Sequence, residues 1–239
     1  MTVAPTRGGK GETFVTPTAL TYDGSLFVID PKGQCAAITA RERCKRRRKV
    51  YIVNPWGVHG ELLNDPARNS LGRGACFNPL DIELDDPREV LDLALLLAEA
   101  LVLKEPGADK PFFPLSAREL IAVLILYVLA NDEVTPKTLI TMRHILRDPA
   151  RLDYALAWSM QSEAYDGLLR GKAARFAEEV KPEKPKDEAP AWDSTATPAT
   201  PLYRYRQNES AQDVYATALV ETSLLDSGYL AGVMGSSDF

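Results

Sequence analysis

The chain contains few of the residues that build disulfide frameworks or metal sites. Its 239 residues include three cysteines (Cys35, Cys44 and Cys76), an odd number without a Cys-x-x-Cys pair. This excludes a disulfide framework and a cysteine-bound zinc site, so we expect reduced thiols in a cytoplasmic protein. The two histidines, His59 and His144, lie far apart in the sequence and flank no cysteine or carboxylate pattern. We expect no metal ligands among them.

We also expect no apolar run long enough to cross a membrane. The most apolar stretch, from Leu120 to Ala130, is about half of the ~20 residues that a spanning helix needs, and Arg118 and Glu119 precede it. We expect a buried helix there, no membrane segment and no signal peptide. The hydrophobic fraction of 45% and the charged fraction of 26% are those of a soluble globular protein. The net charge of −5 argues against a chain that coats nucleic acid over its whole surface.

A glycine-rich segment stands close to the N-terminus, from Ala4 to Gly11 (APTRGGKG). A glycine-rich turn that ends in Gly-Lys can place backbone N–H groups around a polyphosphate, while Lys10 adds a charge for the outer phosphates. The segment departs from the general phosphate-binding loop, because Ala4 replaces its first glycine and Gly11 replaces the hydroxyl residue that holds Mg²⁺. The alternative interpretation is a flexible glycine-rich N-terminus.

An alternation of helices and apolar strands is predicted after this segment. Residues 11–20 favour a short helix, which Pro17 limits. The apolar run at residues 25–29 is typical of a strand buried on both faces of a parallel sheet, and residues 50–53 form a second such run. Residues 34–48 between them favour a helix. The pattern predicts an α/β fold, and because three residues precede the glycine-rich segment, we expect the chain to begin within a domain.

Asp30 follows the first predicted strand and opens an Asp-Pro-Lys-Gly turn at residues 30–33. Two interpretations stay open. Asp30 is either a metal-binding aspartate of the Walker B type, or it belongs to a strand-end turn in which its carboxylate caps the next helix or faces solvent. No second acidic residue adjoins it, so the sequence offers no pair of metal ligand and catalytic base at this position.

From Asp86 onward the apolar residues recur at helical spacing. Asp86 before Pro87 predicts a helix start, and Ser116 with Glu119 predicts a capping box. The stretch at residues 181–201 is rich in proline, alanine and charge, which predicts a flexible or disordered loop. The predicted helices cover residues 86–102, 116–130, 135–147, 149–167 and 210–225.

These patterns divide the chain into four parts. We expect residues 1–85 to form the N-terminal part of a nucleotide-binding core and residues 86–175 to form an all-helical insertion. Residues 176–205 are predicted to be a flexible loop, and residues 206–239 to return to the core.

A dense basic run at residues 41–49 contains seven lysines and arginines. Contact with the phosphates of DNA is one interpretation. The other is the solvated end of a surface helix, where cations suit the helix dipole. No aromatic residue is interleaved, which favours the second interpretation.

Several segments, taken in order along the chain, resemble the coupling proteins of type IV secretion systems, the P-loop ATPase family of conjugative DNA transfer. The segment at residues 4–11 is similar to that family's P-loop, in which glycine often follows the lysine. Residues 27–34 (FVIDPKGQ) resemble its Asp-Pro-Lys-Gly-Glu motif, with Gln34 in place of the glutamate. Further segments that match in order are Thr39–Arg43, Val53–Pro55, Phe77–Leu80, Ser116–Leu120 and Gly235–Phe239.

The resemblance implies an incomplete RecA-like P-loop NTPase core with an inserted all-α domain, which binds ATP and Mg²⁺. The family's membrane helices, first core strand and Walker B Asp-Glu strand have no counterpart in this sequence. We therefore expect a member truncated at both ends, with no catalytic acid that can be named and little or no ATPase activity of its own. The residues that would hold the nucleotide, by match to the family's motifs, are Thr6, Arg7, Gly8, Gly9, Lys10, Gly11 and Asp30.

The resemblance also implies the role of the whole family member. It would be a homo-hexameric motor at the cytoplasmic face of the inner membrane, passing relaxase-bound DNA or effector proteins to a secretion channel. The fragment itself is expected in the cytoplasm. Two alternatives stay open: a non-catalytic module that binds cargo through residues 86–171, and a non-functional remnant of such a protein.

Overall fold

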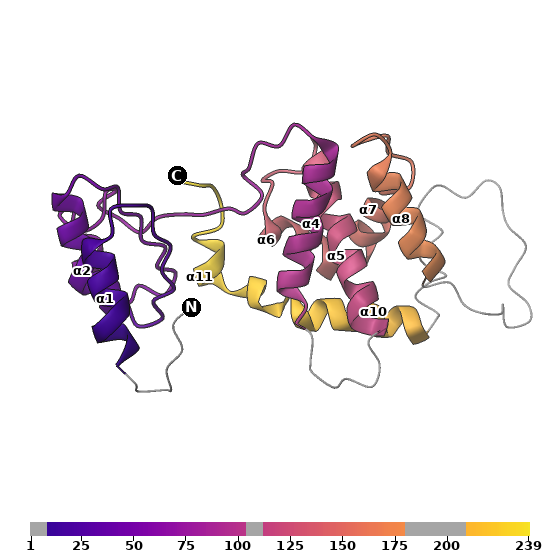
Figure 1. Cartoon of the computed structure of the whole chain (residues 1–239). Helices are drawn as coiled ribbons and strands as arrows, with labels where there is room; N and C mark the ends of the chain where they lie inside the picture. The colour runs from indigo at the N-terminus through magenta and orange to yellow at the C-terminus, as the bar shows by residue number, and fades with distance from the viewer. Residues whose placement is uncertain (1–8, 104–111, 180–208) are drawn as a thin grey trace, which may run out of the picture. The chain divides into compact units, whose positions relative to one another are not determined.

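The computed structural model describes residues 9–103, 112–179 and 209–239, and the chain divides into two compact units. The N-terminal unit comprises Met1–Asn78 together with Gly232–Phe239, and the helical unit comprises Pro79–Ala231 (Figure 1). The helical unit is therefore an insertion, in sequence, between two segments of the N-terminal unit. The loop expected at residues 181–201 lies outside the described residues, and the four predicted domain boundaries stay predictions.

Short helices and extended segments make up the described part of the N-terminal unit. A π-helical turn, η1 (Gly11–Val15), continues directly into α1 (Thr16–Thr21). Pro17 is accepted because it lies in the first turn of α1. The other helices of this unit are α2 (Gln34–Lys45) and the single turn α3 (Gly60–Leu63). The helices expected near residues 11–20 and 34–48 are confirmed, although α2 ends three residues early.

The expected α/β fold with a RecA-like core is wrong, because none of the described residues lies in a β-strand. The apolar run at residues 25–29 belongs to no helix or strand, and no neighbouring strand within the described chain pairs with its backbone. Its side chains are exposed rather than buried: Phe27 is 90% exposed and Ile29 is 80% exposed. Apolar composition predicted a strand, yet a sheet also requires a partner that supplies hydrogen bonds.

The second apolar run, at residues 50–53, is bonded to an irregular segment instead of a sheet. The N–H of Ser70 donates to the carbonyl oxygen of Val50 (2.8 Å). The N–H of Ala75 donates to the carbonyl oxygen of Ile52 (2.9 Å). These isolated bonds satisfy part of the backbone without forming a regular ladder, which is why the predicted strand is absent.

Arg43 ties α2 to the end of α1. Its guanidinium donates to the carbonyl oxygens of Ala19 (3.0 Å), Tyr22 (2.9 Å) and Gly24 (3.0 Å). Carbonyl groups at a helix C-terminus have no partner within the helix, so this side chain satisfies acceptors that would otherwise need water. Arg43, one member of the basic run, therefore has a structural role.

The helical unit is built around α5 (Phe112–Ala130). Every residue from Leu120 to Val128 is at most 4% exposed. A helix that is apolar on all sides must be surrounded by other elements, and α5 packs against five helices (Figure 1). These are α4 (Pro87–Leu101), α6 (Leu139–Arg147), α7 (Pro149–Ser159), α8 (Leu168–Glu179) and α10 (Glu209–Glu221), while η2 (Ser223–Asp226) and α11 (Gly228–Ala231) complete the unit.

Length and composition alone would also allow α5 to cross a membrane, over Phe113–Ala130 with a mean hydropathy of 1.8. Of this stretch, 61% is buried inside the protein. The central helix of a soluble helical bundle has the same composition, so the stretch is weak support for a membrane span. The buried helix expected from Leu120 to Ala130 is confirmed.

Side-chain caps explain where the helices begin. Asp86 Oδ1 accepts from the N–H of Arg88 (2.8 Å), and Pro87 stands in the first turn of α4, as predicted. The capping box expected at Ser116 is wrong, because α5 begins one turn earlier at Phe112 and encloses Ser116 as a buried residue.

Two other boundaries differ from the expected ones for similar local reasons. The helix expected from residue 135 begins at Leu139, since Thr138 Oγ1 accepts from the N–H of Thr141 (3.0 Å). The helix expected to reach residue 167 ends at Ser159. Gly167, with φ at +78°, then leads the chain into α8.

A buried arginine joins α6 to the last part of the helical unit. Arg143 is 5% exposed, and its guanidinium donates to both carboxylate oxygens of Asp226 (3.0 and 2.6 Å). It also donates to the carbonyl oxygen of Leu219 and to Thr222 Oγ1 (2.8 Å each). The hydrogen bonds from Arg143, with the charges of Arg143 and Arg147, hold the pKa of Asp226 below its ordinary value.

Replacing Asp226 by asparagine is expected to lower the free energy of unfolding near neutral pH by about 1–3 kcal/mol, because Arg143 stays buried without its carboxylate partner. The folded pKa of Asp226 is depressed, so its contribution is present above the unfolded pKa and is lost as pH falls through the folded value. The difference between the native chain and D226N should therefore shrink below about pH 4.

Urea unfolding of the two chains over a range of pH measures this difference. The exposed Asp213, which lies on α10 of the same unit, provides the matched control D213N, which should behave like the native chain. Equal unfolding free energies for D226N and the native chain at neutral pH would contradict the structural role of the pair.

Candidate functional site

Gly9 turns the chain into the helix that follows the glycine-rich segment. Its φ is +73°, a conformation that glycine adopts without strain. Its carbonyl oxygen accepts from the N–H groups of Glu12 (3.1 Å) and Thr13 (2.9 Å) and from Thr13 Oγ1 (2.8 Å). The N–H groups of Lys10 and Gly11, which come before these bonds, donate to no acceptor within the described chain, and free N–H groups at the start of a helical segment favour an anion. The geometry at Gly9 therefore suits a phosphate.

Lys10 and Gly11 leave this turn accessible. Lys10 is exposed, and its ammonium group forms no ion pair within the described part of the chain. A Cβ added at Gly11 would meet nothing within 4 Å, so a ligand can approach the backbone there. Thr6, Arg7 and Gly8 lie outside the described residues, and their contacts with phosphate stay a prediction.

Asp30 caps α2. Its Oδ2 accepts from the N–H of Ala36 (2.9 Å), and its carbonyl oxygen accepts from the N–H of Gly33 (3.0 Å). A carboxylate at a helix N-terminus is favoured by the helix dipole. Of the two interpretations of Asp30, this geometry matches the turn with a capping carboxylate. A contact between Asp30 and a nucleotide stays a prediction.

Gly33 makes the turn before α2 possible. Its φ is +66°, and an added Cβ would lie only 3.3–3.4 Å from side-chain atoms of His59, Leu63 and Val58. The left-handed backbone and the close approach both favour glycine. The Asp-Pro-Lys-Gly motif therefore sets the position of α2 against the segment that contains α3.

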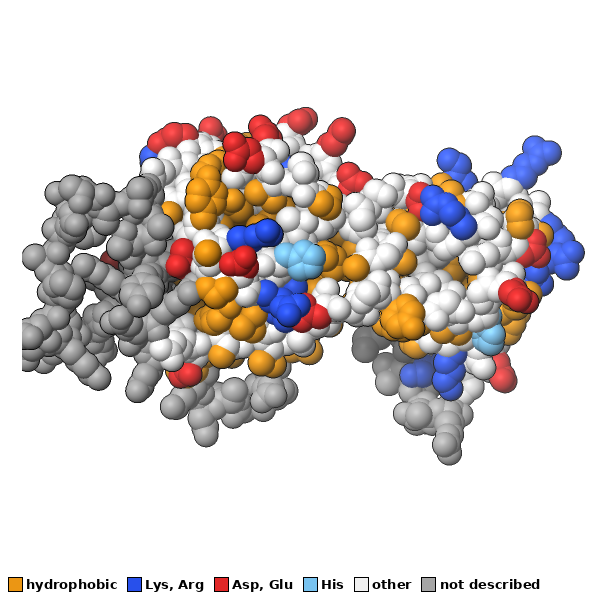
Figure 2. Space-filling model, turned by 180° about the vertical axis from the view of Figure 1, so that it is seen from behind, with side chains coloured by type: hydrophobic (Ala, Val, Ile, Leu, Met, Phe, Trp, Pro, Cys, Tyr) orange, Lys and Arg blue, Asp and Glu red, His pale blue; other side chains and the backbone are white. Residues whose placement is uncertain are grey.

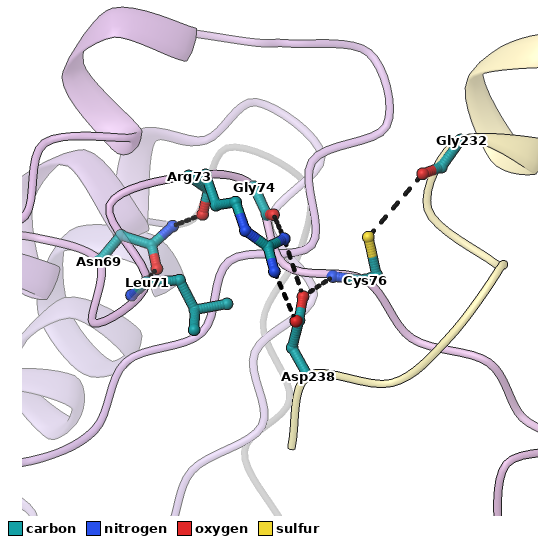
Figure 3. Close-up of polar contacts among 7 residues, drawn as sticks. All are labelled: Asn69, Leu71, Arg73, Gly74, Cys76, Gly232 and Asp238. Carbon is teal, nitrogen blue, oxygen red and sulfur yellow. Dashed lines mark hydrogen bonds and ion pairs between the residues drawn. The ribbon is translucent and has the colours of Figure 1, made fainter.

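The last residues of the chain pair with the segment that precedes the helical unit. The N–H of Phe77 donates to the carbonyl oxygen of Val233 (2.8 Å), and the N–H of Asp238 donates to that of Cys76 (3.1 Å). The Asp238 carboxylate accepts from the N–H of Cys76 (2.7 Å) and from both arms of the Arg73 guanidinium (2.6 and 3.0 Å; Figure 3). The hydrogen bonds from Arg73, followed by that from Cys76, hold the pKa of Asp238 below its ordinary value.

Asn69 supports the loop that carries Arg73. It is fully buried, its Nδ2 donates to the carbonyl oxygen of Arg73 (2.6 Å), and its Oδ1 accepts from the N–H of Leu71 (3.2 Å; Figure 3). The pair of Arg73 and Asp238 was missed from the sequence. The two residues lie 165 positions apart, and no local pattern connects residues at that separation.

The described part of the chain contains no group of three or more His, Cys, Asp or Glu side chains that could hold a metal ion. The three cysteines are free thiols. The turn at Gly9–Gly11 therefore offers backbone groups and one lysine for an anion, and no protein ligand set for a cation has been found beside it.

A separate hollow of about 510 Å³ lies in the helical unit, lined by residues of α4, α5 and α8. Its charged groups have partners. Arg118 Nη2 donates to the carbonyl oxygen of Val102 (2.7 Å), and Arg118 lies 3.5 Å from Glu99. Glu119 forms an ion pair with Lys172. None of the site residues predicted from the sequence lines this hollow.

Comparison with known proteins identifies the family of the chain. The family model described as type IV secretory system conjugative DNA transfer matches residues 1–239. The chain belongs to this family. The resemblance to type IV coupling proteins found in the sequence is thereby confirmed.

Three curated relatives show how much of such a protein the chain represents. Conjugal transfer protein TraG of Escherichia coli is 33% identical over 211 residues, which are 85% of this chain and 31% of TraG. Protein VirD4 of Agrobacterium fabrum is 36% identical over 111 residues, 46% of this chain and 15% of VirD4. Type IV secretion system-coupling protein VirD4 of Bartonella quintana is 30% identical over 147 residues, 58% of this chain and 21% of that relative. The chain thus spans less than a third of the length of these relatives.

Replacing Gly33 by alanine is expected to destabilise the chain by about 1–2 kcal/mol, because alanine is strained at φ +66° and its Cβ approaches three side chains. Gly60→Ala is the matched control, since a Cβ there meets nothing within 4 Å and Gly60 has no positive φ. Thermal and urea unfolding compare the two variants with the native chain. A G33A variant as stable as G60A would contradict the tight turn described here.

Proposed function

We propose that the chain is the nucleotide-binding and cargo-recruiting portion of a type IV secretion coupling protein, and that the turn at Gly9–Gly11 holds the phosphates of ATP. The observation that carries this proposal is the helical segment that follows Gly9, with Lys10 at its positive end, exposed and without an ion pair among the described residues. Membership in a family described as conjugative DNA transfer supports it.

The described residues fit the phosphates of ATP better than they fit a metal ion. Gly11 leaves room for a close approach, and Lys10 supplies the charge. Since no metal-binding cluster has been found among the described residues, Mg²⁺ enters this proposal as the ion carried by the nucleotide's own phosphate oxygens and water. No catalytic acid can be named in this chain, so the proposal covers nucleotide binding and not hydrolysis.

In the whole protein, this portion would belong to a homo-hexameric motor at the cytoplasmic face of the inner membrane. The motor would transfer relaxase-bound DNA or effector proteins to components of a secretion channel. Support comes from the family and from relatives named for conjugal transfer and for secretion coupling. These properties concern the whole protein, of which the chain covers 31% when measured against TraG.

Replacing Lys10 by alanine is expected to weaken binding of a fluorescent ATP analogue about ten- to a hundredfold, the effect of losing one charged hydrogen bond to phosphate. The thermal unfolding temperature should change little, because Lys10 is exposed and forms no ion pair within the described chain. Equilibrium fluorescence titration measures the affinity.

Lys49→Ala removes an exposed lysine from the same unit and should leave the affinity for the ATP analogue unchanged. Absence of saturable binding to the native chain, or equal affinities for K10A and the native chain, would contradict a nucleotide site at this turn.

We also propose that the helical unit docks a basic segment of the transported cargo. Its described residues include 20 aspartates and glutamates but only nine lysines and arginines. Six acidic residues between Asp81 and Asp92 are all exposed, and Figure 2 shows acidic side chains gathered along one edge of this unit. A surface of this charge attracts a positively charged partner and repels DNA.

Neutralising three exposed acids (Glu83→Gln, Asp85→Asn and Glu89→Gln) is expected to weaken binding of an arginine-rich peptide several-fold and to reduce the salt dependence of that binding. Asp86 is left unchanged because it caps α4. The control neutralises three exposed acids elsewhere in the helical unit: Asp132→Asn, Glu133→Gln and Asp213→Asn. Equal losses in both variants, measured by fluorescence anisotropy, would contradict a docking surface at residues 81–92.

A further inference from the structure

The end of α2 carries a dense group of exposed cations. Arg41 and Lys45 lie four residues apart on α2, about 6 Å along its axis. The cations continue beyond the helix through residue 49. We call the exposed members of this group the basic patch: Arg41, Lys45, Arg46, Arg47, Arg48 and Lys49. Arg43 is excluded, because its guanidinium is bonded to backbone carbonyls near the end of α1.

Nearby carboxylates compensate only part of this charge. Glu42 lies 3.5 Å from Lys45 and 3.6 Å from Arg46, and it cannot neutralise both. Asp23, which is 80% exposed, lies 3.7 Å from Arg48. Such long and exposed ion pairs contribute little and are easily exchanged for another anion.

The other three cations of the basic patch have no acidic partner within the described chain. Arg41, Arg47 and Lys49 are exposed, and none of them takes part in an ion pair or a side-chain hydrogen bond. Among the described residues, these three charged groups therefore contribute no polar contact to the fold. Their positive charge is presented to solvent and to whatever binds there.

Arg47 is held in a conformation that disfavours arginine. Its φ is +59°, at the position after α2 where glycine usually stands. The N–H of Arg48 donates to the carbonyl oxygen of Arg43 (3.1 Å), and the N–H of Arg47 donates to that of Cys44 (2.9 Å), which together form a Schellman turn. Glycine would form the same turn without strain, so the arginine side chain costs stability here.

The helix dipole explains only part of the basic patch. Cations near a helix C-terminus are favoured, but the effect falls off within the last turn. Arg47, Arg48 and Lys49 follow the end of α2 at Lys45 and lie outside the helix. An arginine kept at a strained position, with no partner in the fold, indicates a contact with something outside the described chain.

We infer that the basic patch binds the phosphate backbone of DNA without reading its sequence. Four of its six cations are arginines, whose planar guanidinium groups donate two parallel hydrogen bonds to a phosphate. This inference deepens the proposed function, because it names the surface that contacts the transferred DNA. The choice of DNA as the anionic ligand rests on the proposed function.

The chemistry of the basic patch favours a DNA backbone over two other anionic partners. No aromatic side chain lies between Arg41 and Lys49 in the sequence, so the run itself supplies no stacking surface for the bases of a single strand; the exposed Tyr22 next to Asp23 is a single ring beside it. The same stretch has no exposed apolar side chain to insert into a bilayer, and the nearest one along the sequence is Ile38, one turn earlier. A duplex backbone requires only cations.

The test is binding of a fluorescent duplex of about 20 base pairs, of arbitrary sequence, measured by anisotropy over a series of salt concentrations. The patch variant replaces the three cations without acidic partners (Arg41→Gln, Arg47→Gln and Lys49→Gln). We expect its affinity at low salt to fall at least about tenfold. The slope of log K against log salt should decrease by about three, one for each lost phosphate contact.

The control variant removes three exposed cations from the helical unit (Arg88→Gln, Arg151→Gln and Arg170→Gln) and should retain the native affinity for DNA. An unchanged affinity and slope in the patch variant, or an equal loss in the control, would overturn the inference. The inference would also be overturned if vesicles of anionic phospholipid bound through the basic patch while binding of the duplex did not depend on the patch.

Nucleotide titration of the same proteins separates this inference from the proposed function. The patch variant should bind the ATP analogue like the native chain, and K10A should bind duplex DNA like the native chain. Loss of DNA binding in the patch variant, with no nucleotide binding by the native chain, would overturn the nucleotide site and support the patch. Nucleotide binding by the native chain, without DNA binding that depends on the patch, would support the nucleotide site and overturn the inference about the patch.

Arg47→Gly gives an independent readout, because a purely structural role and a role in DNA binding predict different results. Relief of the strained φ should raise the thermal unfolding temperature by about 2–4 °C. The affinity for DNA should fall several-fold, and the salt slope should decrease by about one. A more stable R47G variant with native DNA affinity would overturn the assignment of Arg47 to the DNA-binding surface.

Discussion

The pairing of the chain's last residues with the segment before the helical unit is the constraint on which the rest of the structure depends. The whole of Pro79–Ala231 separates the two segments in sequence, and closing so long a loop costs conformational entropy. The two-armed ion pair between Arg73 and Asp238 opposes this cost, together with the backbone bonds around it. The ring of Phe239 adds a contact with the ring of Tyr51, at 4.8 Å between centroids. The helical unit between these two segments has a core of its own around α5.

The two units are stabilised by different kinds of contact. In the described part of the N-terminal unit, the buried apolar residues are three alanines and one leucine, Leu63. Its elements are positioned instead by side chains bonded to the backbone, such as Arg43 at the end of α1 and Asn54, which closes a turn onto Val58 (2.8 and 3.0 Å). The two units also differ in charge: the described residues of the N-terminal unit include 11 lysines and arginines and seven acids. The helical unit, with a large apolar core, has the opposite charge.

Patterns among neighbouring residues predicted the helices of the helical unit well. Contacts between residues far apart in the sequence could not be predicted. The uninterrupted apolar run from Leu120 predicted the surrounded helix α5, and Asp86 with Pro87 predicted the start of α4. Periodicity and capping could be read because they involve residues a few positions apart. The strand predictions were wrong because a sheet depends on contacts between distant segments. The run at residues 25–29 has the composition of a strand, but the described chain supplies no neighbouring strand to pair with it. For the candidate site, the Gly9–Gly11 turn could be predicted from its motif. The capping of α2 by Asp30 was one of two interpretations. No pattern in the sequence indicated the ion pair of Arg73 and Asp238.

Hydrogen–deuterium exchange of the whole chain, followed by peptide mass spectrometry, tests most directly whether the N-terminal unit is the one that binds phosphates. We predict that an ATP analogue slows exchange in the peptides that contain η1, that duplex DNA slows it in those that cover the end of α2, and that neither ligand protects α4 to α8. Protection confined to the helical unit, or none in the N-terminal unit with either ligand at saturating concentration, would contradict this division of roles.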